Sequence, residues 1–595
     1  MNRRTLLKSL GAAALWAASP FKALAREVAR RVRPGEAGWP SDAEWKRLSD
    51  AVRGNLIKLQ PPFAACKTTD ACTDLFAKDL KNPYLIGDDP ALTQTLGWVD
   101  AWTSKPSAYA VAARSADDMA AAVKFARKHN LRVAVRGGGH SYQGTSNAPD
   151  SLLLWTRHID DITMHDAFVP RGCKTAPQPA VTCGAGVIWG HAYGAVVTKA
   201  GRYVQGGGCA TVNVAGLVQS GGFGTFSKHY GMCAAGLLEA ECVTADGKIR
   251  TVNACNDPEL FFALKGGGGG SFAVVTHVTL RVRELPENFG AAVLRITAAS
   301  DDDYRRLVRR FVDFYAENLF NPHWGEQAEF TGDNQLNVTM VAHGMSGDEI
   351  RKVWQPFMDW LAQSPKAYTH REPPLFPSVP AQHWWDAAFM NAQLPGVFQT
   401  DTRPGAKPSD GWWSGDAAQV GQFMYGYESL WLPESLLQGD ARARLADALF
   451  AASRPWGVSL HFNKGLAGAP PEEIASAKEV ATNPAVQSAF TLAIAGGAQQ
   501  PAYPGVPGHE PDEARGRRVR ENIARTMAEL RKLAPDGGSY VSEANYFDKD
   551  WQRAYWGANY PRLMVAKKKY DPDGMFIVHN GVGSEEWSAD GFTRS

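Results

Sequence analysis

The sequence predicts an α+β protein built from two or more domains. Its 595 residues exceed what a single hydrophobic core usually organises. Residues 96–285 contain short β-type runs joined by glycine-rich turns, and residues 286–534 contain amphipathic helices interleaved with strand-like alternations. We therefore expect a glycine-rich α+β domain followed by a second domain in which helices cover an antiparallel sheet.

The first 25 residues have the pattern of a targeting segment. Arg3 and Arg4 form a twin-arginine pair, residues 10–18 are apolar, and Ala23-Leu24-Ala25 has the small residues of a cleavage site. The apolar stretch is too short to be a permanent membrane anchor. The segment resembles a twin-arginine signal peptide, which predicts a periplasmic or secreted protein. The alternative is a charged tail beside a buried helix.

Residues 26–95 form a polar lead-in punctuated by prolines. In the first domain a helix is expected over 115–128, because Met119, Ala122 and Val123 share one face and Ser115 can cap its start. The other elements expected from periodicity are helices at 43–55, 301–315 and 440–452 and strands at 131–135, 181–183, 238–244, 274–282, 335–341 and 422–429.

Charge argues against a nucleic-acid partner. The chain has 63 Lys and Arg against 61 Asp and Glu, a net charge of +2, and no long basic run. Its 19 Trp and 17 Tyr could stack on sugar rings, although most are expected in the core.

The most informative stretch is Arg136-Gly137-Gly138-Gly139-His140, which continues as Ser141-Tyr142-Gln143-Gly144. Consecutive glycines let the backbone approach a large anionic cofactor and point its N–H groups at phosphate oxygens. The histidine would stand at the edge of that cradle. A glycine run is also common in ordinary turns, so this motif needs support from a second one.

A second motif places a cysteine between glycine clusters. It starts as Gly206-Gly207-Gly208-Cys209-Ala210-Thr211-Val212 and runs through Asn213 to Ser220-Gly221-Gly222-Phe223-Gly224. A third stretch lies near the C-terminus, where residues 551–576 follow the pattern W-x-x-x-Y-x-G-x-N-Y-x-R-L-x-x-x-K-x-x-Y-D-P-x-x-x-F.

Together these segments resemble the berberine bridge enzyme-like branch of the vanillyl-alcohol oxidase and p-cresol methylhydroxylase flavoproteins. The resemblance implies a two-subdomain FAD-binding domain (PCMH-type), a substrate domain over 286–534 and a closing segment, 535–595, that returns to the FAD domain. It also implies two covalent bonds to FAD, from His140 to the flavin 8α-methyl group and from Cys209 to flavin C6. Residues that depart from the family motif around Cys209 put the oxygen-side lining in doubt: Ala210, Asn213, Ala215, Leu217, Gln219 and Ser220.

The same resemblance assigns residues to the cofactor. The glycine run 266–270 resembles a family turn against the flavin diphosphate, and Asn580 is carried over from a polar family position. The expected cofactor-binding residues are Arg136, Gly137, Gly138, Gly139, His140, Ser141, Gly144, Cys209, Val214, Gly221, Gly222, Gly224, Gly269, Val275 and Asn580.

The base could come from residues 539–546, which take the place of the family's Y-x-N-Y segment. Aligned directly, Tyr540 matches the catalytic tyrosine; shifted by three residues, Tyr546 matches the second tyrosine and Glu543 occupies the catalytic position. A phenol needs strong tuning to act as a base at neutral pH, whereas a carboxylate needs little. Tyr427 is a further candidate on an alternating run.

Polar clusters elsewhere offer weaker candidates. Tyr425 and Glu428 flank Tyr427 on the same run, and His461, Asn463 and Lys464 could position a substrate hydroxyl. No metal site is expected, because the histidines lack paired ligand spacing. A G-x-S-x-G hydrolase motif is missing from the sequence.

Eight cysteines in an exported chain permit disulfides. With Cys209 on the flavin, seven remain, so at least one is unpaired within the monomer. Cys66 with Cys72, and Cys173 with Cys183, are close enough in sequence to pair. Small buried hydrophobes are the alternative for each pair.

These observations predict an exported FAD-dependent oxidase. Its expected substrate is a hydroxyl group on a sugar, oligosaccharide or other polar alcohol, and its expected acceptor is O2. Alternatives are a dehydrogenase of the same fold with a cytochrome or quinone acceptor, oxidative cyclisation of a natural product, and a non-catalytic flavin-binding protein. The oligomeric state stays open.

Overall fold

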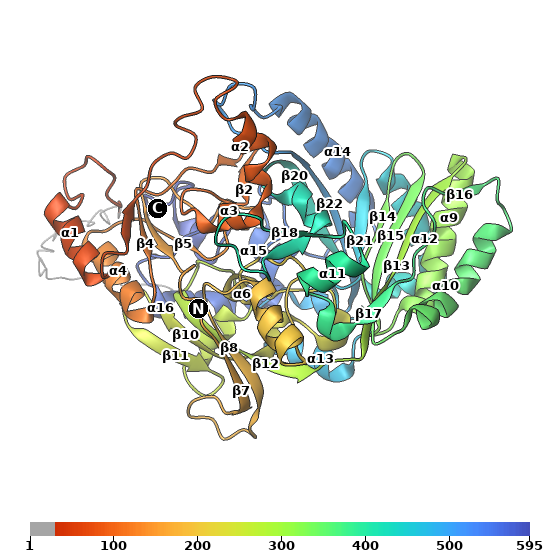
Figure 1. Ribbon diagram of the computed structural model, residues 1–595, viewed down its shortest axis with the longest axis horizontal. Coiled ribbons are helices and arrows are strands. Elements are labelled where there is room, and N and C mark those ends of the chain that lie inside the picture. The colour runs from red at the N-terminus through yellow and green to blue at the C-terminus, as the bar shows by residue number, and fades with distance from the viewer. Residues whose placement is uncertain (1–29, 595) are drawn as a thin grey trace, which may run out of the picture.

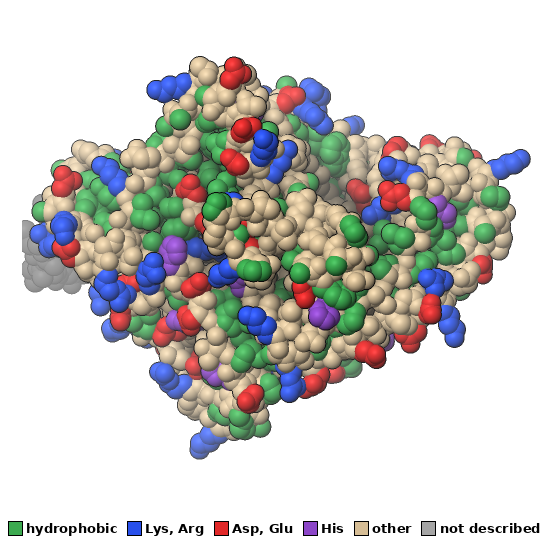
Figure 2. All heavy atoms as spheres, viewed as in Figure 1, with side chains coloured by type: hydrophobic (Ala, Val, Ile, Leu, Met, Phe, Trp, Pro, Cys, Tyr) green, Lys and Arg blue, Asp and Glu red, His purple; other side chains and the backbone are tan. Residues whose placement is uncertain are grey.

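The computed structural model describes residues 30–594 and contains three main β-sheets and a two-stranded pair, with helices packed against them (Figure 1). The twin-arginine segment expected at residues 1–25 lies outside the described residues. From residue 30 to 594, no helix is both long enough and apolar enough to cross a membrane. On the face shown in Figure 2, acidic and basic side chains are interspersed, without a large field of one sign.

A four-stranded sheet, in the order β1-β4-β6-β5, leads into the first glycine loop. β6 pairs in parallel with β4 and β5, and β1 pairs antiparallel with β4. Helix α4 packs on it through Met119 and Val123, and the Ser115 side chain accepts the Asp118 N–H at the helix start, as expected. The bounds are α1 Asp42–Ala51, β1 Leu56–Lys58, β4 Tyr109–Ala112, α4 Ala116–Lys128, β5 Val133–Arg136 and β6 Leu152–Trp155.

Helix α1 ends four residues before the expected end at residue 55. Arg53 and Gly54 have φ values of 57° and 82°. This left-handed backbone cannot continue an α-helix, and it turns the chain into β1 at Leu56.

A second, antiparallel sheet has the order β11-β10-β12-β8-β7, with β9 paired to β12. Its core is shared with helices of the closing segment, because Trp556 and Leu563 belong to the same buried cluster as Val181 and Val278. The bounds are β7 Ile162–Phe168, β8 Gln178–Gly184, α5 Trp189–Tyr193, β9 Arg202–Val204, α6 Val214–Gln219, α7 Ser227–Tyr230, β10 Leu237–Val243, β11 Ile249–Asn253, α8 Pro258–Leu264, β12 Val274–Glu284, α15 Trp551–Trp556 and α16 Tyr560–Tyr570.

The third sheet is the antiparallel, helix-covered sheet expected over 286–534. Its order is β16-β13-β15-β14-β21-β22-β20-β2-β3, with β17 on β13, and only the β2–β20 pair is parallel. Figure 1 shows α9, α10 and α12 beside β13, β14 and β15, and α14 beside β20 and β22. The bounds are β2 Thr95–Trp98, β3 Trp102–Thr103, β13 Asn288–Ala298, α9 Asp301–Phe314, β14 Trp324–Phe330, β15 Gln335–His343, α10 Gly347–Ala362, β16 Tyr368–His370, β17 Ser378–Pro380, β20 Gln422–Pro433, α12 Ala441–Ser453, β21 Val458–His461, β22 Ala489–Gln499 and α14 Glu513–Arg531.

The segment 381–421 runs between β17 and β20 without joining the large sheet. It carries a small aromatic core of its own, in which Phe398 contacts Trp413 edge-on at 5.0 Å between ring centroids. Its elements are α11 Ala387–Gln393, β18 Phe398–Thr400, β19 Gly411–Trp413 and the 3₁₀ helix η6 Ser414–Gln419; the remaining α-helices are α2 Thr73–Ala77, α3 Pro83–Asp88 and α13 Pro471–Ser476.

One of the two expected disulfides is correct. Cys66 bonds to Cys72, but Cys173 bonds to Cys255 and not to Cys183. Cys183 lies in β8 with its side chain buried in the core, whereas Cys255 follows β11 in a turn, where its Cα lies 5.5 Å from that of Cys173. Proximity in space decides the pairing.

Candidate functional site

The first glycine loop leaves β5 and crosses directly over the second. A Cβ atom on Gly137 would lie 2.5 Å from Cγ of Asn213, and one on Gly138 would lie 2.9 Å from the carbonyl oxygen of Thr211. Only bare backbone fits at this crossing. The two motifs, about 70 residues apart in the chain, are therefore one structural unit.

Arg136 lies beneath this crossing and is 1% exposed. Its Nη2 donates to the carbonyl oxygens of Ile86 and Asp89, both at 2.9 Å. Within residues 30–594 its Nε and Nη1 have no hydrogen-bond acceptor. Burial lowers the pKa of Arg136 to about 10, so it remains a cation at neutral pH, and its free donors suit an anionic group.

His140 closes the first loop and contacts the second. Its Nε2 lies 3.0 Å from Oγ1 of Thr211, two residues after Cys209. Burial lowers the pKa of His140 to about 4. The imidazole is thus neutral at pH 7 and retains the ring-nitrogen lone pair that a bond to carbon requires.

Cys209 precedes Thr211 by two residues in the second loop. Its Sγ donates to Oδ1 of Asp416, in η6 of segment 381–421, at 3.4 Å. Burial raises the pKa of the Cys209 thiol well above its usual value, and burial also raises the pKa of Asp416 to about 6. Residues 209–211 of the second motif therefore supply the Cys209 thiol and contact the His140 imidazole of the first.

Near Cys209 lies a partly buried ion pair. Nζ of Lys464 lies 2.6 and 2.7 Å from the two carboxylate oxygens of Glu543. The Tyr142 and Tyr427 rings pack beside it, 5.2 Å apart between centroids, and the Tyr142 hydroxyl donates to Oε1 of Gln419 at 2.8 Å. Burial, and next the negative charge of Glu543, raise the pKa values of both tyrosines well above 10. These phenols stay protonated at neutral pH, and Glu543, paired with Lys464, is the acidic side chain beside them.

Tyr546 lies outside this group, whereas Tyr540 lies near Glu543, whose negative charge adds to burial in raising the pKa of Tyr540. Tyr540 is 3% exposed and packs edge-on against Phe223, and burial raises its pKa. Tyr546 stacks on His579 at 3.7 Å, and its carbonyl oxygen accepts from His579 and Asn580. The register that places Glu543 at the catalytic position therefore agrees with the geometry, and Tyr540 and Tyr546 are better explained as packed aromatics.

Tyr425 and Tyr427 were expected to share one strand face, but the structure separates them. A bulge between Met424 and Gly426 interrupts the pairing of β20 with β22. The Tyr425 ring faces α14 at Gly516 and its hydroxyl donates to Gln499, while Tyr427 points toward Tyr142. The nearby Glu428 pairs with Arg531 of α14.

Of the polar cluster His461, Asn463 and Lys464, Lys464 lies in the site and the other two have different surroundings. Asn463 donates to the carbonyl oxygen of Gly224 at 3.2 Å, which ties it to the second glycine loop. Burial lowers the pKa of His461 well below its usual value, so this imidazole is neutral.

The remaining predicted cofactor residues shape loops. The Ser141 hydroxyl accepts two backbone N–H groups of the next turn, and Gly144 has a φ of 69° against the Trp102 ring. A Cβ on Gly224 would overlap the carbonyl oxygen of Gly206, at 1.5 Å. Val214 opens α6, Gly221 and Gly222 have positive φ, Gly269 lies in the 266–270 turn, Val275 is buried in β12, and Asn580 has a φ of 48°.

Sequence reasoning gave no role to Asp416, Thr211 or Gln419. Asp416 and Gln419 lie in a polar stretch without periodicity, 200 residues from the motifs. Nothing in the sequence marks them as site residues. Thr211 lies within the second motif, and its position two residues after Cys209 was the available signal.

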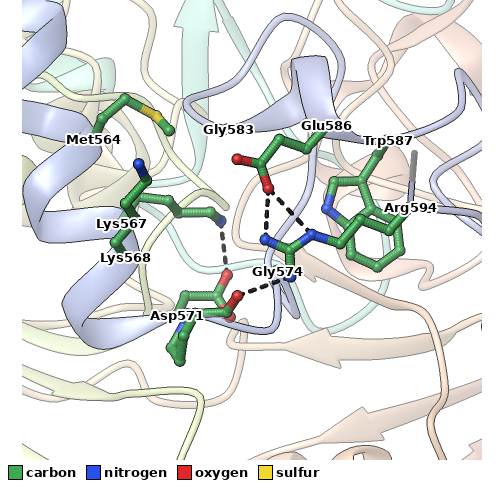
Figure 3. Close-up of a pocket in the computed structure, with 10 residues that line it drawn as sticks. Met564, Lys567, Lys568, Asp571, Gly574, Gly583, Glu586, Trp587 and Arg594 are labelled. Atoms are coloured by element: carbon green, nitrogen blue, oxygen red, sulfur yellow. Dashed lines mark hydrogen bonds and ion pairs between the residues drawn. The ribbon is translucent and has the colours of Figure 1, made fainter. Parts of the chain in front are cut away.

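A cavity of about 20 Å³ near the C-terminus is not the site. Figure 3 shows Lys567, Asp571, Glu586 and Arg594 paired around it. This volume holds about one water molecule. Inside it, Nζ of Lys567 donates to the carbonyl oxygens of Ser271 and Phe576, which fastens the closing segment beside the 266–270 turn.

Comparison with known proteins identifies the family. The FAD binding domain family matches residues 107–253, and the berberine and berberine-like family matches residues 539–583. The VAO-type flavoprotein oxidase VAO615 of Thermothelomyces thermophilus is 30% identical, over 95% of this chain and 94% of its own length. The chain belongs to the VAO-type flavoproteins, in their berberine bridge enzyme-like branch. It is an FAD-linked oxidoreductase.

Solved structures confirm the fold of this VAO-type protein. MtVAO615 from Myceliophthora thermophila C1 superposes with a TM-score of 0.73 at 26% identity, covering 95% of this chain and 100% of that one. Glucooligosaccharide oxidase from Acremonium strictum superposes with a TM-score of 0.63 at 22% identity, covering 82% of this chain and 94% of that one. The expected α+β architecture with an FAD-binding domain is correct.

The residues of the crossing fit FAD. A buried guanidinium with free donors beside bare glycine backbone suits the diphosphate, and the two nucleophilic side chains suit the edge of a flavin ring. His140, Cys209 and Arg136 would hold it. When bound, FAD accepts a hydride.

Proposed function

We propose that this FAD-linked oxidoreductase carries its flavin on two covalent bonds, from His140 and Cys209. One observation carries the proposal: His140, on the first loop, contacts the side chain of Thr211, which lies two residues after Cys209 on the second loop, and the Lys464–Glu543 pair lies near that thiol. A covalent bond to the flavin needs a nucleophile. The neutral His140 imidazole and the Cys209 thiol, which is hydrogen-bonded to the Asp416 carboxylate, are two such groups. A glucooligosaccharide oxidase of the same fold is described as having 6-S-cysteinyl, 8α-N1-histidyl FAD.

The attachment is tested by acid precipitation. The wild-type protein should keep its yellow colour in the pellet. His140→Ala and Cys209→Ala should each keep it through the remaining bond, and the double variant should release it. Colour that washes from the wild-type pellet would contradict both bonds.

The reaction that fits the site is oxidation of a hydroxyl group. Glu543 accepts the hydroxyl proton, and Lys464 holds the carboxylate in place through both oxygens. Tyr427 stays protonated and can donate a hydrogen bond to the substrate oxygen. We propose a sugar, an oligosaccharide or another polar alcohol as substrate, since carbohydrate oxidases are among the proteins of this fold.

We propose O2 as the electron acceptor and H2O2 as the product. The substitutions Leu217 and Gln219, which motivated a dehydrogenase alternative, lie in α6, where the Gln219 amide donates to its own helix at Ala215. Gln219 is thus turned back on the helix. We also propose export through the twin-arginine route, so that the folded, flavin-loaded protein acts in the periplasm or outside the cell.

A substrate panel separates these possibilities. Anaerobic mixing with sugars and phenolic alcohols should bleach the flavin for the right class, and air should restore the colour with H2O2 release. Reoxidation by a dye or quinone but not by air would favour the dehydrogenase. A flavin that no compound bleaches would favour a binding protein.

A further inference from the structure

We propose that Asp416 is the base that removes the thiol proton of Cys209 while the flavin becomes attached to that sulfur. The proposal rests on the bicovalent attachment proposed above and assigns a role within it. Asp416 contacts the reacting sulfur directly, at 3.4 Å between Oδ1 and Sγ, with the thiol as donor.

The carboxylate is held in position by its own segment. Asp416 lies in η6, whose last residue, Gln419, accepts the Tyr142 hydroxyl of the histidine loop. At its first residue, the Ser414 hydroxyl donates to the carbonyl oxygen of Gly396. η6 therefore reaches both glycine loops, with Asp416 over the cysteine.

The second carboxylate oxygen of Asp416 is not engaged by another group in the described part of the chain. Oδ2 of Asp416 is buried and, among residues 30–594, has no hydrogen-bond partner. The nearby charged groups are engaged elsewhere: Glu326 accepts from Asn463, and Lys464 pairs with Glu543. Among these groups, Asp416 is the one hydrogen-bonded to the Cys209 thiol.

Proton removal is the difficult part of this step. Burial raises the pKa of the Cys209 thiol well above its usual value, so the thiolate is scarce without a base. Burial, and next the negative charge of Glu326, raise the pKa of Asp416 to about 6. The carboxylate is therefore ionised at neutral pH and is more basic than an exposed aspartate.

The step balances as follows. The Sγ–H bond breaks, its proton passes to Oδ1 of Asp416, and Sγ forms a bond to carbon 6 of the flavin ring. That carbon loses its hydrogen as a proton, so forming the thioether releases two protons and two electrons. The electrons reduce the bound flavin, and dioxygen takes them up to give H2O2.

The test compares full-length variants produced in parallel. Asp416→Asn should carry flavin on His140 while its free Cys209 thiol, measured by mass spectrometry of the denatured protein, rises at least fivefold. Asp416→Glu should restore much of the linkage. Asp410→Asn is the matched control, because Asp410 lies in the same segment but pairs with His191. Full linkage in Asp416→Asn, formed at the wild-type rate, would overturn the proposal.

Wild-type protein provides an independent readout if the variants do not fold. Apoprotein from riboflavin-starved cells is mixed with FAD, and thioether formation is followed against pH. The titratable groups facing the reaction are Asp416, Glu326, Lys464, the tyrosines Tyr142, Tyr193 and Tyr427, and the thiol itself. An inflection near pH 6 supports Asp416, whereas a rise only above pH 9 overturns it. A free Cys209 thiol in the mature wild-type protein would instead refute the bicovalent attachment.

Discussion

At the scale of single residues, the structure separates two candidates for the catalytic base, Tyr540 and Glu543, that the sequence could not rank. Tyr540 is packed against Phe223, whereas Glu543, three residues later, pairs with Lys464. The sequence placed both at the catalytic position in alternative registers. It could not choose, because the choice depends on Lys464, which comes from a loop 79 residues away.

Glu543→Gln should lower kcat by roughly 10²–10⁴-fold, because the amide cannot accept the substrate proton. Flavin content should not change. Tyr540→Phe is the control and should keep kcat within about threefold. Steady-state kinetics with the substrate found in the panel measure both. If Tyr540→Phe lost as much activity as Glu543→Gln, the assignment would have to be reversed.

Gly137→Ala should abolish flavin incorporation. The new methyl group would lie 2.5 Å from the Asn213 side chain, which donates to the carbonyl oxygens of Ala185 and Val187 and cannot move cheaply. The ratio of flavin to protein absorbance measures the loss. Gly172→Ala is the control, since nothing lies within 4 Å of a Cβ there, even though its φ of 79° is positive and that of Gly137 is not. Normal flavin content in Gly137→Ala would refute a tight crossing.

At the scale of elements, local sequence patterns predicted where helices begin, but they did not predict features that depend on distant segments of the chain. Helices α4 and α9 begin at serine caps, Ser115 and Ser300, as their sequences indicate. The β20 bulge and the position of η6 carried no local signal. Both depend on contacts with segments distant in the chain, which periodicity cannot report.

The two disulfides should differ in their contribution to stability. Cys173–Cys255 closes a separation of 82 residues, and Cys66–Cys72 closes one of 6. On loop entropy alone, removing the first by double serine substitution should lower the free energy of unfolding by about 4 kcal/mol, and removing the second by about 2 kcal/mol. Denaturant unfolding of the flavin-free proteins measures both. The reverse order would show that loop entropy does not dominate.

Lys228→Met should destabilise the junction between α7 and the large sheet. Nζ of Lys228 donates to three buried carbonyl oxygens, those of Gly465, Ala467 and Phe490. The methionine leaves all three without a donor, which costs about 1–3 kcal/mol for each. Thermal unfolding measures the effect against Lys532→Met, an exposed lysine directly after α14. An unchanged Tm would show that the three hydrogen bonds of Lys228 do not stabilise this junction.

At the scale of the whole molecule, a histidine pair joins the FAD-binding half to the large sheet. His229 of α7 stacks on His343 of β15 at 3.7 Å, and Nε2 of His343 lies 3.0 Å from the Tyr230 hydroxyl. Burial lowers the pKa of His229 to about 4 and that of His343 to about 3. Both are neutral in the folded protein at neutral pH.

This pair should make the protein sensitive to acid. Between about pH 6.5 and pH 4 the unfolded chain binds protons that the folded pair does not, so the free energy of unfolding falls as pH falls through this window. Tm measured from pH 7 to 4.5 should decline, and His343→Gln should flatten the decline. An identical slope in the variant would place the acid sensitivity elsewhere.

The whole-molecule arrangement was predictable to the extent that motifs carried it. Three motifs, at residues 136–144, 206–224 and 551–576, identified the family, and the family supplied the architecture. The large sheet's recruitment of β2 and β3, from residues 95–103, was not foreseeable. These strands precede the FAD motifs, and the pairing of β2 with β20, over 300 residues later, is set by three-dimensional packing.

The closing segment also sets an order of events during biosynthesis. Trp556 donates to the carbonyl oxygen of Gly266, and Lys567 donates to that of Ser271, so the two ends of the glycine run at 266–270 are secured by residues made almost 300 positions later. A nascent chain still lacking them has both nucleophiles but an unfinished pocket. Cofactor loading must therefore wait until translation is nearly over, and ribosome-arrested chains stopped before residue 550 should emerge colourless.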